Sequence, residues 1–249
     1  EGSPGAYSTE ADADTQAALR AVAARRRLRL LSVGAAGHDI RIGRATPLPD
    51  GQALELLAFG ARQSLHLALP GRFQADNALL AAALAGGDAL AGLPRLRGVR
   101  GRMEQAATLR GASAYVDYAH TPDALARLLT ALRPHATGRL ICVFGAGGDR
   151  DPGKRPLMGE VVARLADQAI ITDDNPRGEA PATIRAAIRA AAPGALEIGG
   201  RRAAIAAGLN LLRPGDVLVV AGKGHESGQT VAGVTTPFDD ASVIRELAA

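Results

Sequence analysis

A repeated unit in the second half of the chain limits the folds that are open to it. An apolar strand runs into a polar loop, and a helix follows. Three complete copies cover residues 113–134, 139–167 and 168–191, and a fourth strand and loop (215–226) leads into a polar stretch rich in turns. In the first copy Thr121 is suited to cap the helix and Pro122 to begin it. Apolar strands that alternate with helices predict an α/β fold with a doubly wound, mostly parallel sheet covered on both faces.

Each of these strands is followed by an unusual polar cluster. The clusters are "DYAH" (117–120), "GAGGDRD" (145–151), "DDNPR" (173–177) and "GKGHE" (222–226). In parallel sheets ligands bind at the carboxyl ends of the strands. We therefore expect the four clusters to face one crevice.

The loop after the third strand carries the chemistry of an amino-acid site. The planar fork of Arg177 suits a carboxylate, and Asn175 can both donate and accept. A neighbouring Asp174 or Glu226 suits an ammonium group, and Pro176 stiffens the turn. A guanidinium and a carboxylate together fit the head group of an amino acid. The alternative is a turn held by an Asp–Arg ion pair, with no ligand.

Two other motifs leave their roles open. "GDRDPGKR" (148–155) has the spacing of a phosphate-binding loop, but Asp149, Asp151 and Pro152 oppose that function, since the acids repel phosphate and proline lacks an N–H. We interpret the glycines of residues 145–148 as allowing a sharp turn after the strand. Asp117, an exposed acid at a strand end, could bond ribose hydroxyls or a magnesium-bound water, and His120 could bind there or cap the turn. No zinc spacing or Ser–His–Asp arrangement is visible.

The first half of the chain follows another pattern. We predict no regular structure for the first eight residues, a strand at 28–33, a hairpin within 38–59 that turns at 49–51, and a strand at 63–69. A helical pattern begins at Asn77. Glycine and proline then interrupt the pattern, and we place a domain boundary near Gly101.

Composition narrows the function classes. The net charge is +4, but basic residues are scattered among acids and aromatics make up only 3%, so we expect no nucleic-acid partner. No apolar stretch approaches the ~20 residues of a membrane helix, and no signal peptide is visible. The single cysteine, Cys142, lies in an apolar run and is interpreted as a small buried hydrophobe. We expect a cytoplasmic protein without membrane insertion, and the start at Glu1 suggests a fragment of a longer chain.

Five motifs occur in an order that identifies a family. They are "GRMEQ" (101–105), "VDYAHTPDAL" (116–125), "VFGAGGDRDPGKRPLMG" (143–159), "TDDNPR" (172–177) and "AGKGHE" (221–226). This set closely resembles the Mur ligase family, and within it the members that add meso-diaminopimelate. The segment "GRFQADNALLAAALA" (71–85) resembles the end of the family's central ATPase domain. The resemblance implies that residues 1–100 are the last part of that domain and that residues 101–249 are a complete, Rossmann-like C-terminal domain, which binds the incoming amino acid.

The resemblance also implies a reaction. With Mg²⁺, ATP phosphorylates the D-glutamate carboxylate of a UDP-linked muramoyl dipeptide. The amino group of meso-diaminopimelate then attacks the acyl phosphate, and the products are the tripeptide, ADP and phosphate. This is a step of peptidoglycan precursor synthesis, and the partners implied are ATP, the dipeptide and meso-diaminopimelate.

Site residues follow from the same resemblance. Those expected to bind meso-diaminopimelate are Arg150, Asp174, Asn175, Pro176, Arg177, Gly222 and Glu226. Those expected to contact ATP are Asn77, Arg102, Asp117 and His120. We assign no catalytic residue and no metal ligand within this chain.

The chain departs from the family pattern in several places. Gln74 replaces the usual asparagine, and Ala241 follows "FDD" where relatives often carry arginine. The family's phosphate-binding loop, carbamylated lysine, magnesium ligands and uridine-nucleotide domain are missing. Two other classes therefore stay open: a non-catalytic module that binds an amino acid, and a dinucleotide-binding oxidoreductase. The second lacks the G-x-G-x-x-G motif after its first strand.

Overall fold

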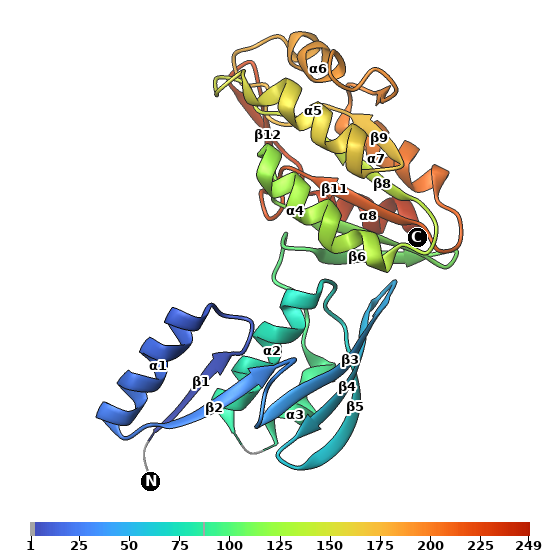
Figure 1. Ribbon diagram of the computed structural model, residues 1–249. Coiled ribbons are helices and arrows are strands. Elements are labelled where there is room, and N and C mark those ends of the chain that lie inside the picture. Colours follow the sequence, from blue (N-terminus) through green and yellow to red (C-terminus); the bar gives the residue numbers. More distant parts are fainter. Residues whose placement is uncertain (1–2, 87) are drawn as a thin grey trace. The chain divides into compact units, whose positions relative to one another are not determined.

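The computed structural model describes residues 3–86 and 88–249 (Figure 1). The chain forms two compact units, Glu1–Arg97 and Gly98–Ala249, which we call unit 1 and unit 2. The break between them falls a few residues before Gly101, where the composition changes. Among the described residues, no helix is long and apolar enough to span a membrane.

Unit 1 contains a five-stranded sheet. Its elements are β1 (Pro4–Ser8), α1 (Ala13–Arg26), β2 (Arg29–Gly34), β3 (Ile40–Leu48), β4 (Gly51–Ala58), β5 (Ala61–Leu67), α2 (Arg72–Ala85), α3 (Ala89–Gly92) and the 3₁₀ turn η1 (Leu93–Arg95). The strand order follows the chain, β1 to β5. The first three strands are parallel, and β3, β4 and β5 are antiparallel. The hairpin predicted within 38–59 is confirmed as β3 and β4.

Two predictions for unit 1 were wrong. The first eight residues are not all irregular, because Pro4–Ser8 forms β1 and pairs with Arg29–Val33 of β2; residues 1 and 2 lie outside the described part. That pairing is non-local, so the short polar segment gave no sign of it. The second error concerns α2, which begins at Arg72 rather than Asn77. Gly71 (φ 87°) lets the chain turn into the helix there, and the Gln52 amide fixes this corner by donating to the Gly71 carbonyl at 2.9 Å.

Unit 2 is the predicted doubly wound α/β domain. Its elements are β6 (Glu104–Leu109), β7 (Ala112–Asp117), α4 (Pro122–Leu132), η2 (Arg133–His135), β8 (Leu140–Phe144), α5 (Lys154–Leu165), β9 (Gln168–Ile171), α6 (Pro181–Arg189), β10 (Leu196–Glu197), α7 (Arg201–Leu211), β11 (Val217–Ala221), β12 (Gly228–Val231), β13 (Val234–Pro237) and α8 (Asp240–Ala248). The main sheet has the order β10-β9-β8-β11-β7-β6, and only β6 runs antiparallel to its neighbour. The polar stretch after β11 is a separate β12–β13 hairpin.

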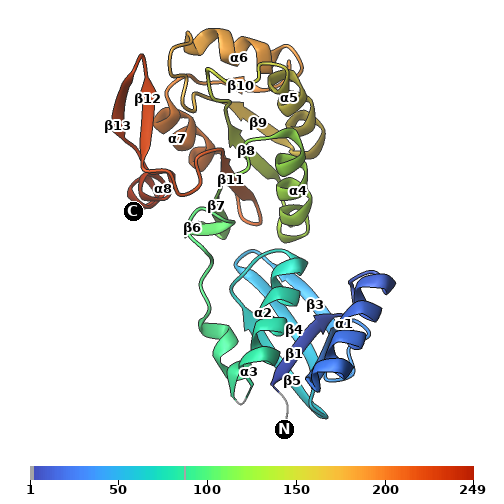
Figure 2. The same cartoon turned by 90° about the vertical axis from the view of Figure 1, so that its left-hand side faces the viewer.

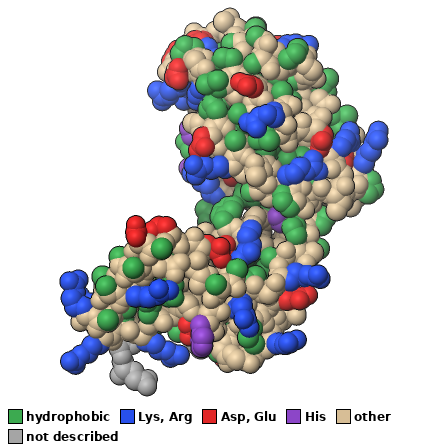
Figure 3. Space-filling model, viewed as in Figure 1, with side chains coloured by type: hydrophobic (Ala, Val, Ile, Leu, Met, Phe, Trp, Pro, Cys, Tyr) green, Lys and Arg blue, Asp and Glu red, His purple; other side chains and the backbone are tan. Residues whose placement is uncertain are grey.

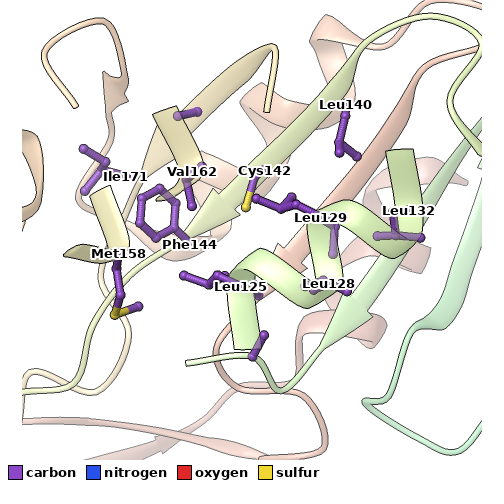
Figure 4. Close-up of a cluster of buried hydrophobic side chains, with 14 of the residues drawn as sticks. Leu125, Leu128, Leu129, Leu132, Leu140, Cys142, Phe144, Met158, Val162 and Ile171 are labelled. Carbon is purple, nitrogen blue, oxygen red and sulfur yellow. The ribbon is translucent and has the colours of Figure 1, made fainter. Parts of the chain in front are cut away.

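Apolar side chains pack each face of this sheet against helices. Figure 2 shows α4 and α5 on one side of the sheet and α7 and α8 on the other. Figure 4 shows Cys142 and Phe144 of β8 among the apolar side chains of α4 and α5. Burial raises the pKa of the Cys142 thiol to about 12, so this group stays neutral and packs as an apolar side chain, as predicted. The predicted cap of α4 is also confirmed, since Thr121 accepts from the Ala124 amide and Pro122 begins the helix.

At the amino ends of β8 and β11, one carboxylate joins the two strands. Asp216 is buried and accepts from the Arg139 amide at 2.7 Å, from the Arg139 guanidinium at 2.6 Å and from the Arg213 amide at 3.0 Å. Burial alone would raise the pKa of Asp216, but the hydrogen bonds from Arg139 outweigh it and hold the pKa below the ordinary 3.8. The ionised form therefore stabilises the fold.

We predict that Asp216→Asn destabilises unit 2 by roughly 2 kcal/mol at pH 7, since charge-assisted hydrogen bonds are lost. A carboxylate whose pKa is depressed in the folded state contributes fully to the free energy of unfolding when the pH is above its pKa in the unfolded state, near 3.8. This contribution is lost as the pH falls through the pKa of the folded state. The stability gap between wild type and variant should therefore narrow below about pH 3.8. Urea unfolding followed by the NMR signals of unit 2 measures this gap, and a gap that is constant down to pH 2 would contradict the assignment.

Candidate functional site

A pocket of about 290 Å³ opens at the carboxyl ends of β7, β8, β9 and β11. It is lined by Tyr118, His120, Gly147, Arg150, Lys154, Asp174, Asn175, Arg177, Gly222 and Glu226. Every one of the four polar clusters contributes to this lining. The convergence expected from parallel strands is therefore present within unit 2.

The pocket carries charges of both signs. Arg150, Lys154 and Arg177 supply positive charge, and Asp174 and Glu226 supply negative charge. Arg150 is exposed at the rim. The Lys154 ammonium donates to the His120 carbonyl at 3.0 Å, and partial burial lowers its pKa. Lys154 was missed in the sequence because "GDRDPGKR" was set aside as a false phosphate-binding loop. A lysine at the start of a helix that follows a strand-end loop was the available signal.

A buried network holds the loop after β9. Asn175 donates to Glu226 Oε2 at 2.9 Å, and its Oδ1 accepts from the Lys223 ammonium at 2.8 Å. The same ammonium lies 3.7 Å from Asp174 Oδ1. Burial lowers the pKa of Lys223, and these acceptors offset that cost. Sequence reasoning also missed Lys223, although a lysine inside a loop directly after a buried strand is an unusual placement.

Arg177 makes no ion pair with any described residue. Its Nη1 donates to the carbonyl of Gly148 at 2.8 Å, while the partner of Asp174 is Lys223. The alternative of a turn held by an Asp–Arg ion pair therefore fails for Arg177, while Asp173 of the same loop pairs with Arg185 of α6. The contact with Gly148, and a longer one from Nη1 to the Asn175 carbonyl at 3.4 Å, hold the guanidinium of this pocket-lining residue.

Close approach of backbones explains the glycines in these loops. A Cβ on Gly145 would lie 2.3 Å from the Thr172 carbonyl oxygen, and a Cβ on Gly148 would lie 1.9 Å from that of Pro176. Neither glycine has a positive φ. The chain does bend at residues 148–150, after β8, but the bend needs no positive φ at either glycine. The two glycines are needed where the loop after β8 touches the loop after β9. Gly222 does have a positive φ (119°), and a Cβ there would meet Asp174 Oδ2 at 2.5 Å.

A buried ion pair lies beneath the loops. Arg201 and Asp240 are both inaccessible to solvent and pair through two hydrogen bonds, at 2.8 and 2.7 Å. Arg201 also donates to the carbonyls of Asp173 and Ala221, at 3.3 and 3.0 Å. The pair thus ties the ends of β9 and β11 to the starts of α7 and α8. Asp240, the last residue of "FDD", therefore has a structural role, and Ala241 beside it is buried.

The pocket includes some, but not all, of the residues expected to contact nucleotide. His120 lines the pocket, whereas Arg102 stacks on the Tyr118 ring at 4.4 Å from its centre. Asp117 is half-buried rather than exposed and accepts from the amides of Met103 and Ala119, both at 2.8 Å. Burial raises its pKa. These two hydrogen bonds from backbone amides explain why the Asp117 side chain is half-buried at the end of β7.

Two further predicted residues stand apart from the pocket. Pro176 is buried and is not part of the pocket lining. Asn77 belongs to unit 1, where it is exposed on α2. Within residues 3–86 and 88–249, no group of three or more His, Cys, Asp or Glu side chains is arranged to hold a metal ion.

The comparison with protein families agrees with the geometry. Residues 101–224 match the model described as "Mur ligase, glutamate ligase domain". The chain belongs to the Mur ligase family. The matched range contains β6 to β11, the first three polar clusters and residues 222–224 of the fourth. All of the residues that line the pocket except Glu226 therefore lie within the match.

Two curated relatives of this Mur ligase chain and one solved structure share a name. The protein from Caulobacter vibrioides named UDP-N-acetylmuramoyl-L-alanyl-D-glutamate–2,6-diaminopimelate ligase is 59% identical over 218 residues, which cover 85% of this chain and 45% of the relative. A protein of the same name from Rhizobium meliloti is 49% identical over 243 residues, covering 94% and 50%. A solved structure of that name has a TM-score of 0.81 at 32% identity and covers 98% of this chain and 53% of its own. The chain thus spans about half the length of these relatives.

We predict that Gly148→Ala disrupts the site, because the added Cβ would overlap the Pro176 carbonyl and force the two loops apart. Overpacking of this kind costs roughly 1–3 kcal/mol. The Arg177 amide donates to the Thr230 carbonyl, so its hydrogen exchange should become faster. Gly194→Ala is the matched control, since a Cβ there meets nothing within 4 Å. Equal Arg177 exchange in the two variants would show that the close approach is not required.

Proposed function

We propose that this chain is the amino-acid-binding part of a ligase that joins meso-diaminopimelate to UDP-N-acetylmuramoyl-L-alanyl-D-glutamate, in peptidoglycan precursor synthesis. The observation that carries the proposal is the charge pattern of the pocket. Two arginines, one lysine and two carboxylates face a single cavity, and meso-diaminopimelate has two carboxylates and two ammonium groups. The Lys154 ammonium already donates to the His120 carbonyl. The relatives' names support the same assignment.

The proposed contacts follow from the chemistry of each side chain. Arg177 pairs with the distal carboxylate of diaminopimelate through its planar fork, and Arg150 binds from the rim. Asp174 and Glu226 accept from an ammonium group. Gly222 provides the space that lets the Asp174 carboxylate approach the pocket. Lysine has no distal carboxylate, so in its complex Arg177 would be partly desolvated without a partner. Sites built around a polar partner reject analogues that lack it.

This arrangement positions a nucleophile. The attacking group is an amine of diaminopimelate in its neutral form, and the electrophile is the D-glutamate carboxylate activated as an acyl phosphate. ATP supplies the phosphoryl group. Carboxyl-binding residues fix one end of the amino acid, and this restricts the directions in which its amine can point. Arg102, Asp117, His120 and, in unit 1, Asn77 are proposed as contacts to ATP.

Mg²⁺ is proposed as a cofactor of the complete ligase. Among the described residues, no group of three or more His, Cys, Asp or Glu side chains is arranged to hold a metal ion. A cytoplasmic location accompanies the proposed function, since it uses ATP and a UDP-linked substrate.

A second reading is a module that binds the amino acid without joining it to anything. The same pocket geometry favours it, because binding needs only unit 2. The names of the relatives favour the ligase. The dinucleotide-binding oxidoreductase is not favoured by the family match or by any of these relatives.

We predict that Arg177→Ala weakens binding of meso-diaminopimelate by about 10- to 100-fold, since a charge-assisted pair is worth about 1.5–3 kcal/mol. Binding of L-lysine should change much less, so the preference between the two ligands narrows. Arg177→Lys should restore little, because a point charge does not reproduce the fork. Calorimetry with both ligands on the 249-residue chain measures the preference. An unchanged preference in Arg177→Ala would contradict the proposed contact.

We also predict that the 249-residue chain by itself catalyses no ATP-dependent ligation. Phosphoryl transfer depends on positioned phosphates and metal ions, and the sequence contains no loop with the P-loop pattern and its terminal Ser or Thr. The assay measures phosphate released in the presence of ATP, Mg²⁺, the UDP-linked dipeptide and meso-diaminopimelate. Release above that of a control without the dipeptide would contradict this prediction.

A further inference from the structure

The β12–β13 hairpin lies on the loop that contains Arg177. Three consecutive contacts join them: the Gln229 side-chain amide donates to the Asp174 carbonyl at 2.7 Å, the Thr230 amide donates to Asn175 Oδ1 at 3.0 Å, and the Arg177 amide donates to the Thr230 carbonyl at 3.1 Å. A fourth contact closes the set, since the Ala232 amide donates to the Arg177 carbonyl at 2.7 Å. Residues 174, 175 and 177 are thus each bound by β12 or by the turn after it.

The backbone of Arg177 needs such support. Its φ is 52°, in the left-handed region that favours glycine and that costs a side-chain-bearing residue about 1–2 kcal/mol. The hairpin binds both its amide and its carbonyl, and an isolated bridge pairs Arg177 with Val231. Because the conformation of a strained residue persists only where its surroundings fix it, the direction of the Arg177 side chain depends on the hairpin.

The hairpin itself is a peripheral element. All four residues of β13 are exposed, and the exposed fraction of Val234 reaches 64%. Figure 2 shows the hairpin as a separate two-stranded ribbon at the edge of unit 2. Residues 228–237, which form the hairpin, include no charged side chain. Figure 3 shows lysine, arginine and acidic side chains scattered over the face in view. A contact from such an element contributes little to the core, so its main effect is on the loop that it touches.

Among the four contacts, the one from Gln229 is made by a side-chain donor of the hairpin. We propose that Gln229 is a positioning residue for the amino-acid site: by holding the Asp174 carbonyl it keeps the 174–177 loop in the geometry that presents Arg177 to the ligand. This inference rests on the proposed function where it concerns the preference between diaminopimelate and lysine. It concerns a residue outside the pocket lining, acting through the loop rather than on the ligand.

Two substitutions test the donor itself. Gln229→Met keeps the length of the side chain and removes the donor, and Gln229→Glu keeps the shape and places a carboxylate oxygen against the Asp174 carbonyl. Thr235→Val is the matched control, because it removes the 2.9 Å hydrogen bond between Thr230 and Thr235 inside the hairpin and leaves the contacts with the loop in place. Dissociation constants for meso-diaminopimelate and L-lysine are measured by calorimetry, and exchange of the Arg177 amide is measured by NMR, on the 249-residue chain.

We expect Gln229→Met to weaken diaminopimelate binding by about 10-fold, the value of one hydrogen bond, and lysine binding by much less. Gln229→Glu should have the larger effect, and Thr235→Val should behave as wild type. Exchange of the Arg177 amide should accelerate in the first two variants only.

The outcomes separate this inference from the proposed function. A wild-type ligand preference in Gln229→Met, with or without faster exchange, would overturn the positioning role in recognition. If the wild-type chain itself does not prefer diaminopimelate, the proposed function fails. In that case, faster exchange of the Arg177 amide in Gln229→Met would still show that Gln229 stabilises the 174–177 loop. Unchanged exchange would overturn this structural role as well.

Discussion

The buried ammonium group of Lys223 is the interaction on which the site depends. Burial of a cation is costly unless oxygen acceptors replace its water. The Lys223 ammonium donates to Asn175 Oδ1 and to the Gly228 carbonyl, each at 2.8 Å. One acceptor belongs to the loop after β9, and the other begins β12. Because Lys223 itself follows β11, a single charge joins three segments that are distant in sequence. Displacing any of them would leave the ammonium unpaired in the interior, so the segments move together or not at all.

The architecture of unit 2 could be predicted because its sequence is locally consistent. Val217–Ala221 is apolar at every position, and in the sheet it is buried on both faces between β7 and β8. The polarity that follows such strands predicted that four loops would meet, since parallel strands end at one edge. Thr121 and Pro122 fixed the start of α4 by local chemistry alone. These are short-range signals, and short-range signals are readable in a single sequence.

The features that were missed arise from contacts between segments. Nothing near Asp216 in the sequence indicates that its carboxylate binds the Arg139 backbone. The polar segment Pro4–Ser8 becomes a strand only because β2 is beside it. Asp117 was expected to be exposed from its place at a strand end, and the Met103 amide, from the segment before β6, covers it instead. The same limit applies to Gly145 and Gly148, whose role is set by the carbonyls that approach them and not by their own torsion angles.

The contact between the loops after β8 and β9, at Gly145 and Gly148, has a consequence for how such a site can diverge. Main chain rests against main chain there, and no insertion or bulkier residue fits between the two loops. The length and path of both loops are therefore fixed by the scaffold, whereas side chains that point from them into the cavity are not. If Arg177 has the role proposed for it, a Mur ligase domain with this geometry would acquire a different amino-acid preference by exchanging that side chain, with the backbone frame inherited unchanged.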